Sequence, residues 1–309
     1  MDQQREKETP KYIDPFNLKC LSAKIGEFTL IFPGSSEVSL GKTINIKNVD
    51  RLKQPINGDL LTCLRRSILK QSEFDGVMVS GGIDSSLLAY IATEIKPDCK
   101  LLSAGFRDSE DLKYADILSS DLKSKLIKTE LTDDKVEDIV SILKRLNLET
   151  YSIIIGITEY ATLERAKNVG CKAVFSGLGS DELFFGFEKH KRISIEDLAA
   201  LRTERLSQLY RLGVLRAKSI AKFLRIEVLF PYLDEGVLNY ALTRDINELI
   251  TDDYNKSLLR RAGKELGMNP ILLERKKKAM QYGSGVVKIL SRLAKKHKNK
   301  NIGEYIKDI

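Results

Sequence analysis

Two short glycine-containing strings carry side chains suited to phosphate chemistry, and the first is Ser80-Gly81-Gly82-Ile83-Asp84-Ser85-Ser86. An apolar run ends at its Ser-Gly-Gly turn, and a helical pattern begins directly after it. Such a helix start offers unpaired backbone N–H groups and a positive dipole end to an anion, and glycine lets a ligand approach closely. Ser80 and Ser85 add hydroxyl groups, and Asp84 adds a carboxylate that could hold Mg²⁺ between phosphates. The string predicts a nucleotide phosphate site; the alternative is an ordinary turn capped by Asp84 or Ser85.

The second string is Ser176-Gly177-Leu178-Gly179-Ser180-Asp181-Glu182, which again follows apolar residues. In an open parallel sheet, ligands bind beyond the carboxyl ends of the strands. Two glycine-rich strand ends that both carry carboxylates therefore suggest one shared site, with Asp84 and Asp181 bracketing Mg²⁺ and pyrophosphate. The alternative is that Asp181 and Glu182 only begin a helix and interact with its dipole.

The elements that must position these strings alternate between strand and helix. The predicted strands are 74–80, 100–105, 124–129 and 172–176, and the predicted helices between and around them are 60–71, 84–95, 109–120, 133–146 and 151–170, with Asp59, Thr132 and Asp133 as candidate caps. This order favours an α/β fold with a doubly wound parallel sheet. Past residue 190 the predicted elements are helices, at 195–210, 213–224, 234–243, 256–266 and 286–297.

Three regions follow from this reading. Short β-rich runs at 18–47, broken by Gly and Pro, predict a small β-rich N-terminal segment within 1–57. Residues 58–190 are expected to form the nucleotide-binding α/β core. Residues 191–309 are expected to form a helical C-terminal part that completes the same domain.

The first string resembles the SGGxDS signature of the PP-loop ATP pyrophosphatases (adenine nucleotide alpha hydrolase-like fold), which cleave ATP between the α and β phosphates. The second resembles the SGEGSDELFGGY motif of the asparagine synthetase family, in its synthetase domain. The resemblance extends in order over about residues 57–287 and includes the following segments: Ser103-Ala104-Gly105-Phe106, Phe230-Pro231-Tyr232-Leu233-Asp234, Lys256-Ser257-Leu258-Leu259-Arg260 and Glu274-Arg275-Lys276-Lys277.

The resemblance implies a ligase of asparagine biosynthesis that uses ATP and Mg²⁺. A substrate carboxylate attacks the α-phosphate, pyrophosphate leaves, and ammonia then displaces AMP. Asp84 and Asp181 would hold Mg²⁺, and Lys277 would neutralise the departing pyrophosphate, although Lys277 could instead belong to a solvated basic run. The residues implied to contact the nucleotide are Ser80, Gly81, Gly82, Ser85, Ser103, Gly105, Ser176 and Gly177.

The sequence departs from the family pattern in three respects. Leu178 stands where the family has a glutamate thought to accept a proton from ammonia, and leucine cannot act as a general base. Counting back from Ser176, the stretch 152–158 corresponds to a polar, arginine-bearing substrate loop but is apolar here. Residue 2 is Asp2 and no glutaminase domain is expected, so ammonia would come from solution or from a separate glutaminase subunit. The residues implied to bind the nucleotide (the nucleotide half of the site) are therefore all present. The residues implied to bind and amidate the acceptor (the acceptor half) differ from the family pattern.

The composition leaves two other classes open. The formal net charge is +8, with basic runs near the C-terminus, which raises the alternative of a PP-loop enzyme acting on tRNA. The altered acceptor half raises the alternative of a non-enzymatic partner protein that retains ATP binding. No apolar run approaches the about 20 residues of a membrane span, and no signal peptide is evident, so a cytoplasmic protein is expected. The four cysteines and two histidines show no metal-ligand spacing.

Overall fold

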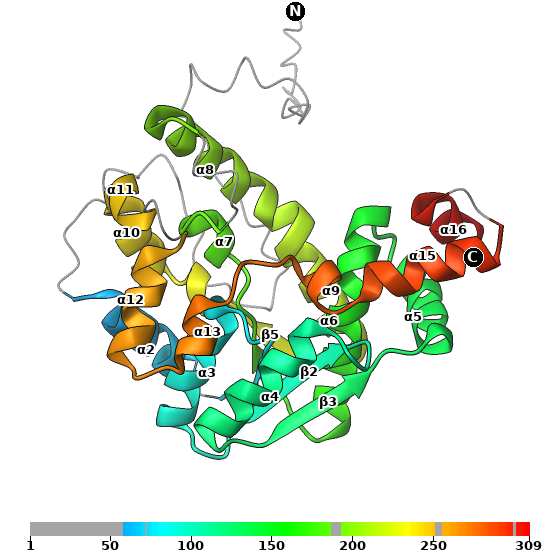
Figure 1. Ribbon diagram of the computed structural model, residues 1–309, viewed down its shortest axis with the longest axis horizontal. Helices are drawn as coiled ribbons and strands as arrows, with labels where there is room; N and C mark the ends of the chain where they lie inside the picture. Colours follow the sequence, from blue (N-terminus) through cyan, green and yellow to red (C-terminus); the bar gives the residue numbers. More distant parts are fainter. Residues whose placement is uncertain (1–57, 72, 187–192, 251–254, 299–300) are drawn as a thin grey trace, which may run out of the picture. The chain divides into compact units, whose positions relative to one another are not determined.

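The computed structural model describes residues 58–71, 73–186, 193–250, 255–298 and 301–309 (Figure 1). The predicted β-rich segment in 1–57 lies outside these residues.

Among the described residues, five parallel strands form one sheet in the order β3-β2-β1-β4-β5. They are β1 (Gly76–Met78), β2 (Lys100–Gly105), β3 (Leu126–Glu130), β4 (Ala173–Phe175) and β5 (Glu227–Leu229). In the central strand, Val77 is opposite Leu101 of β2 on one side and Phe175 of β4 on the other. The strand order thus reverses direction between β1 and β4, which is where open parallel sheets form a binding crevice. The predicted doubly wound parallel sheet is confirmed.

Helices cover both faces of the sheet (Figure 1). The helices that the structure describes are α2 (Leu60–Lys70), α3 (Ile83–Ile95), α4 (Glu110–Leu122), α5 (Asp133–Arg145), α6 (Thr150–Asn168), α7 (Ser180–Leu183), α8 (Ile195–Leu209), α9 (Leu215–Leu224), α10 (Glu235–Thr243), α11 (Ile246–Leu249), α12 (Ser257–Glu265), α13 (Pro270–Glu274), α14 (Met280–Gly283), α15 (Val286–Lys296) and α16 (Ile302–Asp308). A π-helical turn, Tyr210–Val214, joins α8 to α9. Helices α5, α6, α9 and α15 share one apolar core with β2 and β4, while α3 and α4 pack on β1 and β2, with α2 and α12 against α3.

Two predicted helix caps are confirmed. The Asp59 carboxylate accepts a hydrogen bond from the Thr62 N–H at 2.7 Å at the start of α2. The Thr132 hydroxyl accepts one from the Lys135 N–H at 3.3 Å at the start of α5. Side-chain oxygens at these positions satisfy N–H groups that have no partner inside the helix, which is why such helices begin where they do.

The elements predicted past residue 190 do not include Glu227–Leu229, which forms β5 and pairs with β4 through Val174 opposite Val228. A three-residue strand at the sheet edge is too short to show a period of two. The same reason explains the unpredicted short helices, because elements of four to seven residues such as α7 and α16 do not complete two turns of a periodic pattern.

The helix predicted over 151–170 is confirmed as α6, so the stretch 152–158 is helical and the comparison with a substrate loop is wrong. Ile153, Ile157 and Ala161 recur every four residues, so they fall on one helix face, and all three are buried in the apolar core. The apolar character of the stretch is therefore explained by core packing. No helix among the described residues is long and apolar enough to cross a membrane.

Candidate functional site

The loop after β1 turns at Gly81, which has a left-handed backbone (φ +73°). A Cβ atom there would collide with the backbone of Tyr114 in α4, so both the turn and the close approach require glycine. Gly82 follows in extended conformation as the N-cap of α3 and makes no side-chain cap bond. The alternative of a turn capped by Asp84 or Ser85 is therefore not what the structure has.

Hydroxyl groups hold this loop in shape. The Ser85 Oγ accepts a hydrogen bond from the Ser80 N–H at 3.2 Å and donates to the Gly82 carbonyl at 3.2 Å. The Ser80 Oγ accepts from the Gly82 N–H at 3.3 Å. Because these bonds join residues at most five apart, the loop closes on itself and is preformed for a ligand.

Arg275 fixes the same loop from the other end of the chain. Its guanidinium donates to the Ser80 carbonyl and, at 2.6 Å, to the Asp111 carboxylate of α4, and it stacks over the Tyr114 ring at 4.3 Å. The side chains of Arg275 and Asp111 are only 3% and 4% exposed. This buried arrangement, here called the Arg275 clamp, positions the loop against α4.

The loop after β4 meets the first loop directly. A Cβ on Gly177 would lie 3.5 Å from both the Asp84 Cβ and the Ser85 backbone nitrogen, so the two strand ends are in van der Waals contact. The Ser180 hydroxyl donates to Asp84 Oδ1 at 2.6 Å. The buried Tyr232 hydroxyl donates to the Asp84 backbone carbonyl at 3.0 Å. The predicted convergence of the two strings is what the structure shows.

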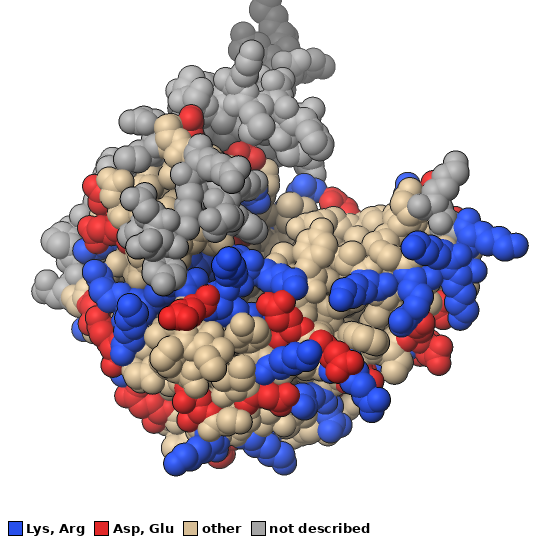
Figure 2. Space-filling model, viewed as in Figure 1, with Lys and Arg blue, Asp and Glu red and all other residues tan. Residues whose placement is uncertain are grey.

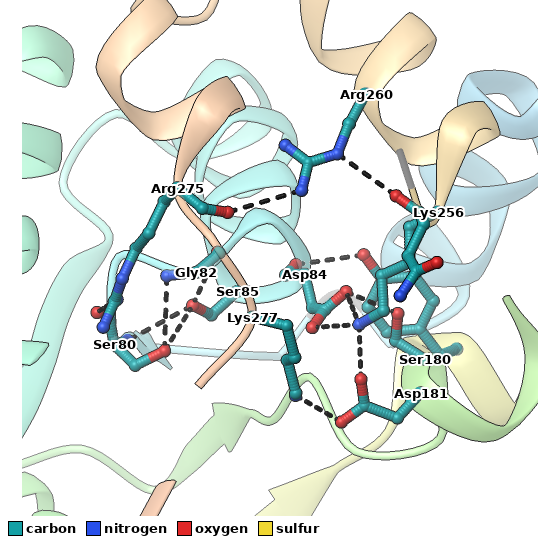
Figure 3. Close-up of polar contacts among 12 residues, drawn as sticks. Ser80, Gly82, Asp84, Ser85, Ser180, Asp181, Lys256, Arg260, Arg275 and Lys277 are labelled. Atoms are coloured by element: carbon teal, nitrogen blue, oxygen red, sulfur yellow. Dashed lines mark hydrogen bonds and ion pairs between the residues drawn. The ribbon is translucent and has the colours of Figure 1, made fainter. Parts of the chain in front are cut away.

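Asp84 and Asp181 lie around the ammonium group of Lys256 (Figure 3). The Lys256 Nζ is 2.5 and 2.6 Å from the two carboxylate oxygens of Asp84 and 2.6 Å from Asp181 Oδ1. Lys277 forms an ion pair with the other oxygen of Asp181. Two carboxylates from different strand ends are thus held together by lysines from the C-terminal part of the chain.

The charges in this cluster shift one another's protonation. Burial by itself would raise the pKa of Asp181, but the Lys256 and Lys277 ammonium groups outweigh it and hold that pKa well below the usual range. Burial and the neighbouring Asp181 charge raise the pKa of Glu182 to about 7. Burial would lower the pKa of Lys277, yet the Asp181 and Asp84 carboxylates raise it above its ordinary value. Lys277 and Asp181 are therefore ionised at neutral pH.

The backbone at Lys256 is left-handed (φ 58°, ψ 41°), an uncommon conformation for a residue other than glycine. Its side chain is only 3% exposed. Gly186 allows this placement, because a Cβ there would collide with both Asp181 Oδ1 and Lys256 Cε. Strained residues of this kind cost about 1–3 kcal/mol and tend to lie at functional sites.

The basic run Arg275–Lys278 is not a uniformly solvated surface. Arg275 is buried, Lys277 contacts Asp181, Lys278 pairs with Glu110 at 2.6 Å, and Lys276 is exposed. Figure 2 shows Lys and Arg side chains from the α12–α13 side across to α15 and α16, with Asp and Glu side chains between them. Lys277 is exposed like Lys276 and Lys278, but its ammonium is paired with Asp181, a contact that the interpretation as a solvated run does not include.

The remaining predicted residues lie at the same sheet edge but are less closely joined to the cluster. Ser103 is buried in β2, and Gly105 ends that strand against the Ser284 carbonyl, 3.1 Å from where a Cβ would be. The Ser176 hydroxyl accepts a hydrogen bond from the Leu178 N–H at 3.4 Å. Ser176 thus shapes the second loop.

Leu178 packs toward the apolar core. Its two Cδ atoms lie 3.3 Å from where a Cβ on Gly213 would be, so it faces the π-helical turn. Just after that turn, in α9, the buried Arg216 forms a bidentate pair with Glu159 of α6, at 2.7 and 2.9 Å, and also donates to the Leu212 carbonyl. Arg216 is therefore already paired within the protein.

Mg²⁺ fits the donors that the two loops provide. Asp84 and Asp181 are hard oxygen donors already gathered around one cation. No group of three or more His, Cys, Asp or Glu suited to a metal occurs among the described residues. A Mg²⁺ ion held here would therefore take its other ligands from substrate phosphates and water, as Mg²⁺ commonly does.

Several residues of the site were not assigned from the sequence. Lys256 was noted only as the first residue of a motif, and its position in that motif was the one available signal. Arg275, Asp111 and Tyr114 carried no signal, because a buried clamp between distant segments leaves no local pattern.

Comparisons with known proteins agree with this geometry. The family model described as asparagine synthase matches residues 62–220 and 197–303. A Methanocaldococcus jannaschii protein whose name is that of a glutamine-hydrolyzing asparagine synthetase is 30% identical over 79% of this chain and 52% of its own length. Asparagine synthetases of Gallus gallus and Homo sapiens are 30% and 28% identical, each over 69% of this chain and 40% of their own length. The chain spans about half or less of the length of these relatives.

Proposed function

Because this chain belongs to the asparagine synthase family, we propose that it is an ATP-dependent amide ligase that adenylates a carboxylate and releases pyrophosphate and AMP. The acceptor is aspartate or a related acid, and the nitrogen donor is ammonia, free or from a separate glutaminase subunit. A cytoplasmic location fits these substrates.

One observation supports this proposal above the others. The carboxylates of Asp84 and Asp181, which follow different strands, are gathered with Lys256 and Lys277 beyond the strand ends, beside a preformed glycine loop. Binding of a triphosphate needs this combination of backbone N–H groups, cations and metal-holding carboxylates.

The proposed chemistry proceeds in two steps. A carboxylate oxygen of the acceptor attacks the α-phosphorus of ATP, and the bond to the β-phosphate breaks, so that an acyl-adenylate forms and pyrophosphate leaves. Ammonia then attacks the acyl carbon, AMP leaves with the bonding electrons, and the nitrogen loses a proton to give the amide. Mg²⁺ supplies charge neutralisation at the phosphates.

The protein's own residues act mainly through position and charge. The Ser80–Ser85 loop would orient the phosphates, and Ser103, Gly105, Ser176 and Gly177 would face the nucleotide. Asp84 and Asp181 would hold the metal, and Lys277 would stabilise charge on the departing pyrophosphate. Such positioning and electrostatic stabilisation account for most of the catalysis of phosphoryl and adenylyl transfer.

The residues expected to serve the acceptor substrate limit which acceptor can be proposed. Leu178 provides no base for the second step, and the charge of the buried Arg216 is already paired with Glu159, so neither is a ready partner for an amino-acid carboxylate. This observation favours either an acceptor other than free aspartate or a second candidate function, a partner protein that binds ATP without turnover.

Isotope exchange between pyrophosphate and ATP tests the proposal, with Mg²⁺ and a panel of carboxylic acids that includes aspartate. The expected result is exchange that depends on one class of acid, and AMP formation on adding an ammonium salt. ATP binding without exchange for any acid would contradict the ligase and favour the ATP-binding partner. Tight, salt-sensitive tRNA binding with exchange only in its presence would favour the tRNA-modifying alternative.

A further inference from the structure

The Lys256 ammonium contacts the carboxylate oxygens of Asp84 and Asp181, the two residues that would hold a metal. It is in contact with both carboxylate oxygens of Asp84 and with Oδ1 of Asp181, all within 2.6 Å. Mg²⁺ needs carboxylate oxygens at about 2.0–2.1 Å. The ammonium and a metal ion would therefore compete for the same oxygens, and two cations at one position repel each other.

We propose that Lys256 is an internal cation that occupies the bridging position between Asp84 and Asp181 and is exchanged for the divalent metal when that metal arrives with nucleotide phosphates. This inference rests on the proposed function, since it takes these carboxylates as the metal ligands. It adds that a residue of the chain itself occupies the metal position and weakens binding of the bare ion.

Charge balance makes the exchange depend on the nucleotide. In this cluster two carboxylate side chains, Asp84 and Asp181, are paired with two lysines, Lys256 and Lys277. A bare divalent ion would place two further positive charges beside two ammonium groups, which is unfavourable. A triphosphate brings about four negative charges with the metal, so the displaced Lys256 ammonium can pair with phosphate oxygens instead of carboxylates.

The surroundings of Lys256 fit a residue held in place for such a role. Its side chain is 3% exposed, its backbone is left-handed, and it lies at the N-cap position of α12. Gly186 leaves room for its stem beside Asp181. Ionised groups are seldom buried unless they are paired, so an ammonium displaced from these oxygens must find another anion nearby.

Binding of Mn²⁺ alone, followed by electron paramagnetic resonance without nucleotide, tests the exchange. The proposal expects weak binding to the native protein and at least about tenfold tighter binding to Lys256→Gln, because a competing charge is removed from the position itself. Lys256→Arg retains the positive charge and should bind Mn²⁺ as weakly as the native protein.

Two matched variants distinguish an effect of the position of the Lys256 charge from an effect of the protein's net charge. Lys277→Gln removes the same charge, but from a lysine paired with the far oxygen of Asp181, and should tighten Mn²⁺ binding less than Lys256→Gln. Lys276→Gln removes an exposed charge from the same basic run and should leave Mn²⁺ affinity unchanged. Equal affinities for the native protein and Lys256→Gln, or equal gains for Lys256→Gln and Lys277→Gln, would overturn the proposal.

A second measurement uses the native protein, in case Lys256→Gln does not fold. Reductive methylation with formaldehyde and borane, read by mass spectrometry, reports how available the Lys256 amine is. Saturating Mn²⁺ should increase methylation of Lys256 and leave Lys276 unchanged, because the metal takes the carboxylates from Lys256. An unchanged Lys256 rate with Mn²⁺ bound would contradict the exchange.

These readouts contain no ATP and no turnover, so they are separable from the ligase. Absent pyrophosphate exchange with the expected Mn²⁺ ranking would refute the ligase alone. Pyrophosphate exchange with no effect of Lys256 on Mn²⁺ affinity would refute the inference alone.

Discussion

The loop after β1 and the loop after β4 meet at one sheet edge, but they are held by different kinds of interaction. The first is shaped by short-range hydrogen bonds among Ser80, Gly82 and Ser85 and carries one charged side chain, Asp84. The second carries Asp181 and Glu182, and Asp181 is held by ion pairs with Lys256 and Lys277.

The difference separates two tasks. A loop that binds phosphates through its backbone must keep one shape, and local hydrogen bonds provide that. A carboxylate that exchanges cations needs partners that can move without unfolding the loop, and long lysine side chains from another part of the chain provide them. The backbone of the first loop is therefore a rigid template, and the carboxylates of the two loops, Asp84 and Asp181, form an adjustable charge site.

Breaking the Arg275 clamp should have the largest effect, because it supports the rigid template. Arg275→Met leaves Asp111 buried without its partner, and removal of one member of a buried pair costs about 3–5 kcal/mol of unfolding free energy. Urea denaturation at pH 7.5 measures this loss. The double variant Asp111→Asn with Arg275→Met should recover part of it, and additive losses would contradict a coupled pair.

The same variant has a defined pH dependence. Burial already raises the pKa of Asp111 above its ordinary value despite Arg275, and loss of that guanidinium raises it further. A carboxyl whose folded-state pKa is raised binds a proton on folding, so its destabilising effect grows as pH rises through that pKa. The stability lost in Arg275→Met should therefore be smaller at pH 5 than at pH 8. A loss that is equal at both values would contradict burial of the Asp111 charge.

Asp84→Asn should cause the next largest effect, which is a loss of turnover. Asp84 lies in the first loop, but its carboxylate joins Asp181 of the second loop in holding the metal. Its carboxylate is bound by Ser180 and Lys256, and the amide can hold a cation only weakly. Pyrophosphate exchange should fall about 100- to 1,000-fold. Asp98→Asn, which changes an exposed aspartate after α3, is the matched control and should exchange like the native protein. Full activity of Asp84→Asn would remove this residue from the metal assignment.

Leu178→Glu tests whether a side chain of the second loop determines amide formation. Placing a carboxylate against Gly213 and the apolar core should reduce the unfolding free energy by about 1–3 kcal/mol. If the acceptor half is altered at this residue, the variant should also gain ammonia-dependent amide formation, followed by mass spectrometry of the product. Leu178→Gln, with the same shape and no charge, is the control. Equal amide yields from both variants would argue against a base at this position.

The smallest effect is expected for a single bond of the rigid template. Ser85→Ala removes the acceptor for the Ser80 N–H and the donor to the Gly82 carbonyl, which should cost about 1 kcal/mol, with little dependence on salt. Ser86→Ala is the matched control, since its buried hydroxyl has no hydrogen-bond partner among the described residues. Thermal unfolding at low and high salt compares the two variants. A similar loss for both would mean that these bonds do not shape the loop.

Much of the fold was predictable, because it depends on local patterns. β2 was predicted with the bounds that the structure has, and Asp59 and Thr132 cap the helices as expected. The convergence of Asp84 and Asp181 was predictable because parallel strands end at one sheet edge. β5 was not, since three residues show no period.

The partners of those carboxylates were harder to predict. Asp84 and Lys256 are 172 residues apart, and Ser80 and Arg275 are 195 apart. Which lysine pairs with which carboxylate depends on how α12 and the segment after α13 pack on the core. This packing cannot be predicted from the spacing of residues along the chain. Arg275 looked like one of four similar basic residues, yet it alone of Arg275–Lys278 is buried. The roles of these residues in turnover are predictions that the variants above test.

The separation between sheet and cations has a consequence for synthesis on the ribosome. All five strands are present once Leu229 has emerged, whereas Lys256, Arg275 and Lys277 emerge later. Domains begin to fold during synthesis at about 5–20 residues per second, so the sheet precedes its site cations by a few seconds. During that interval Asp84 and Asp181 face each other without their ammonium partners. The segment that supplies the lysines of the site is therefore synthesised after every strand that supplies its carboxylates.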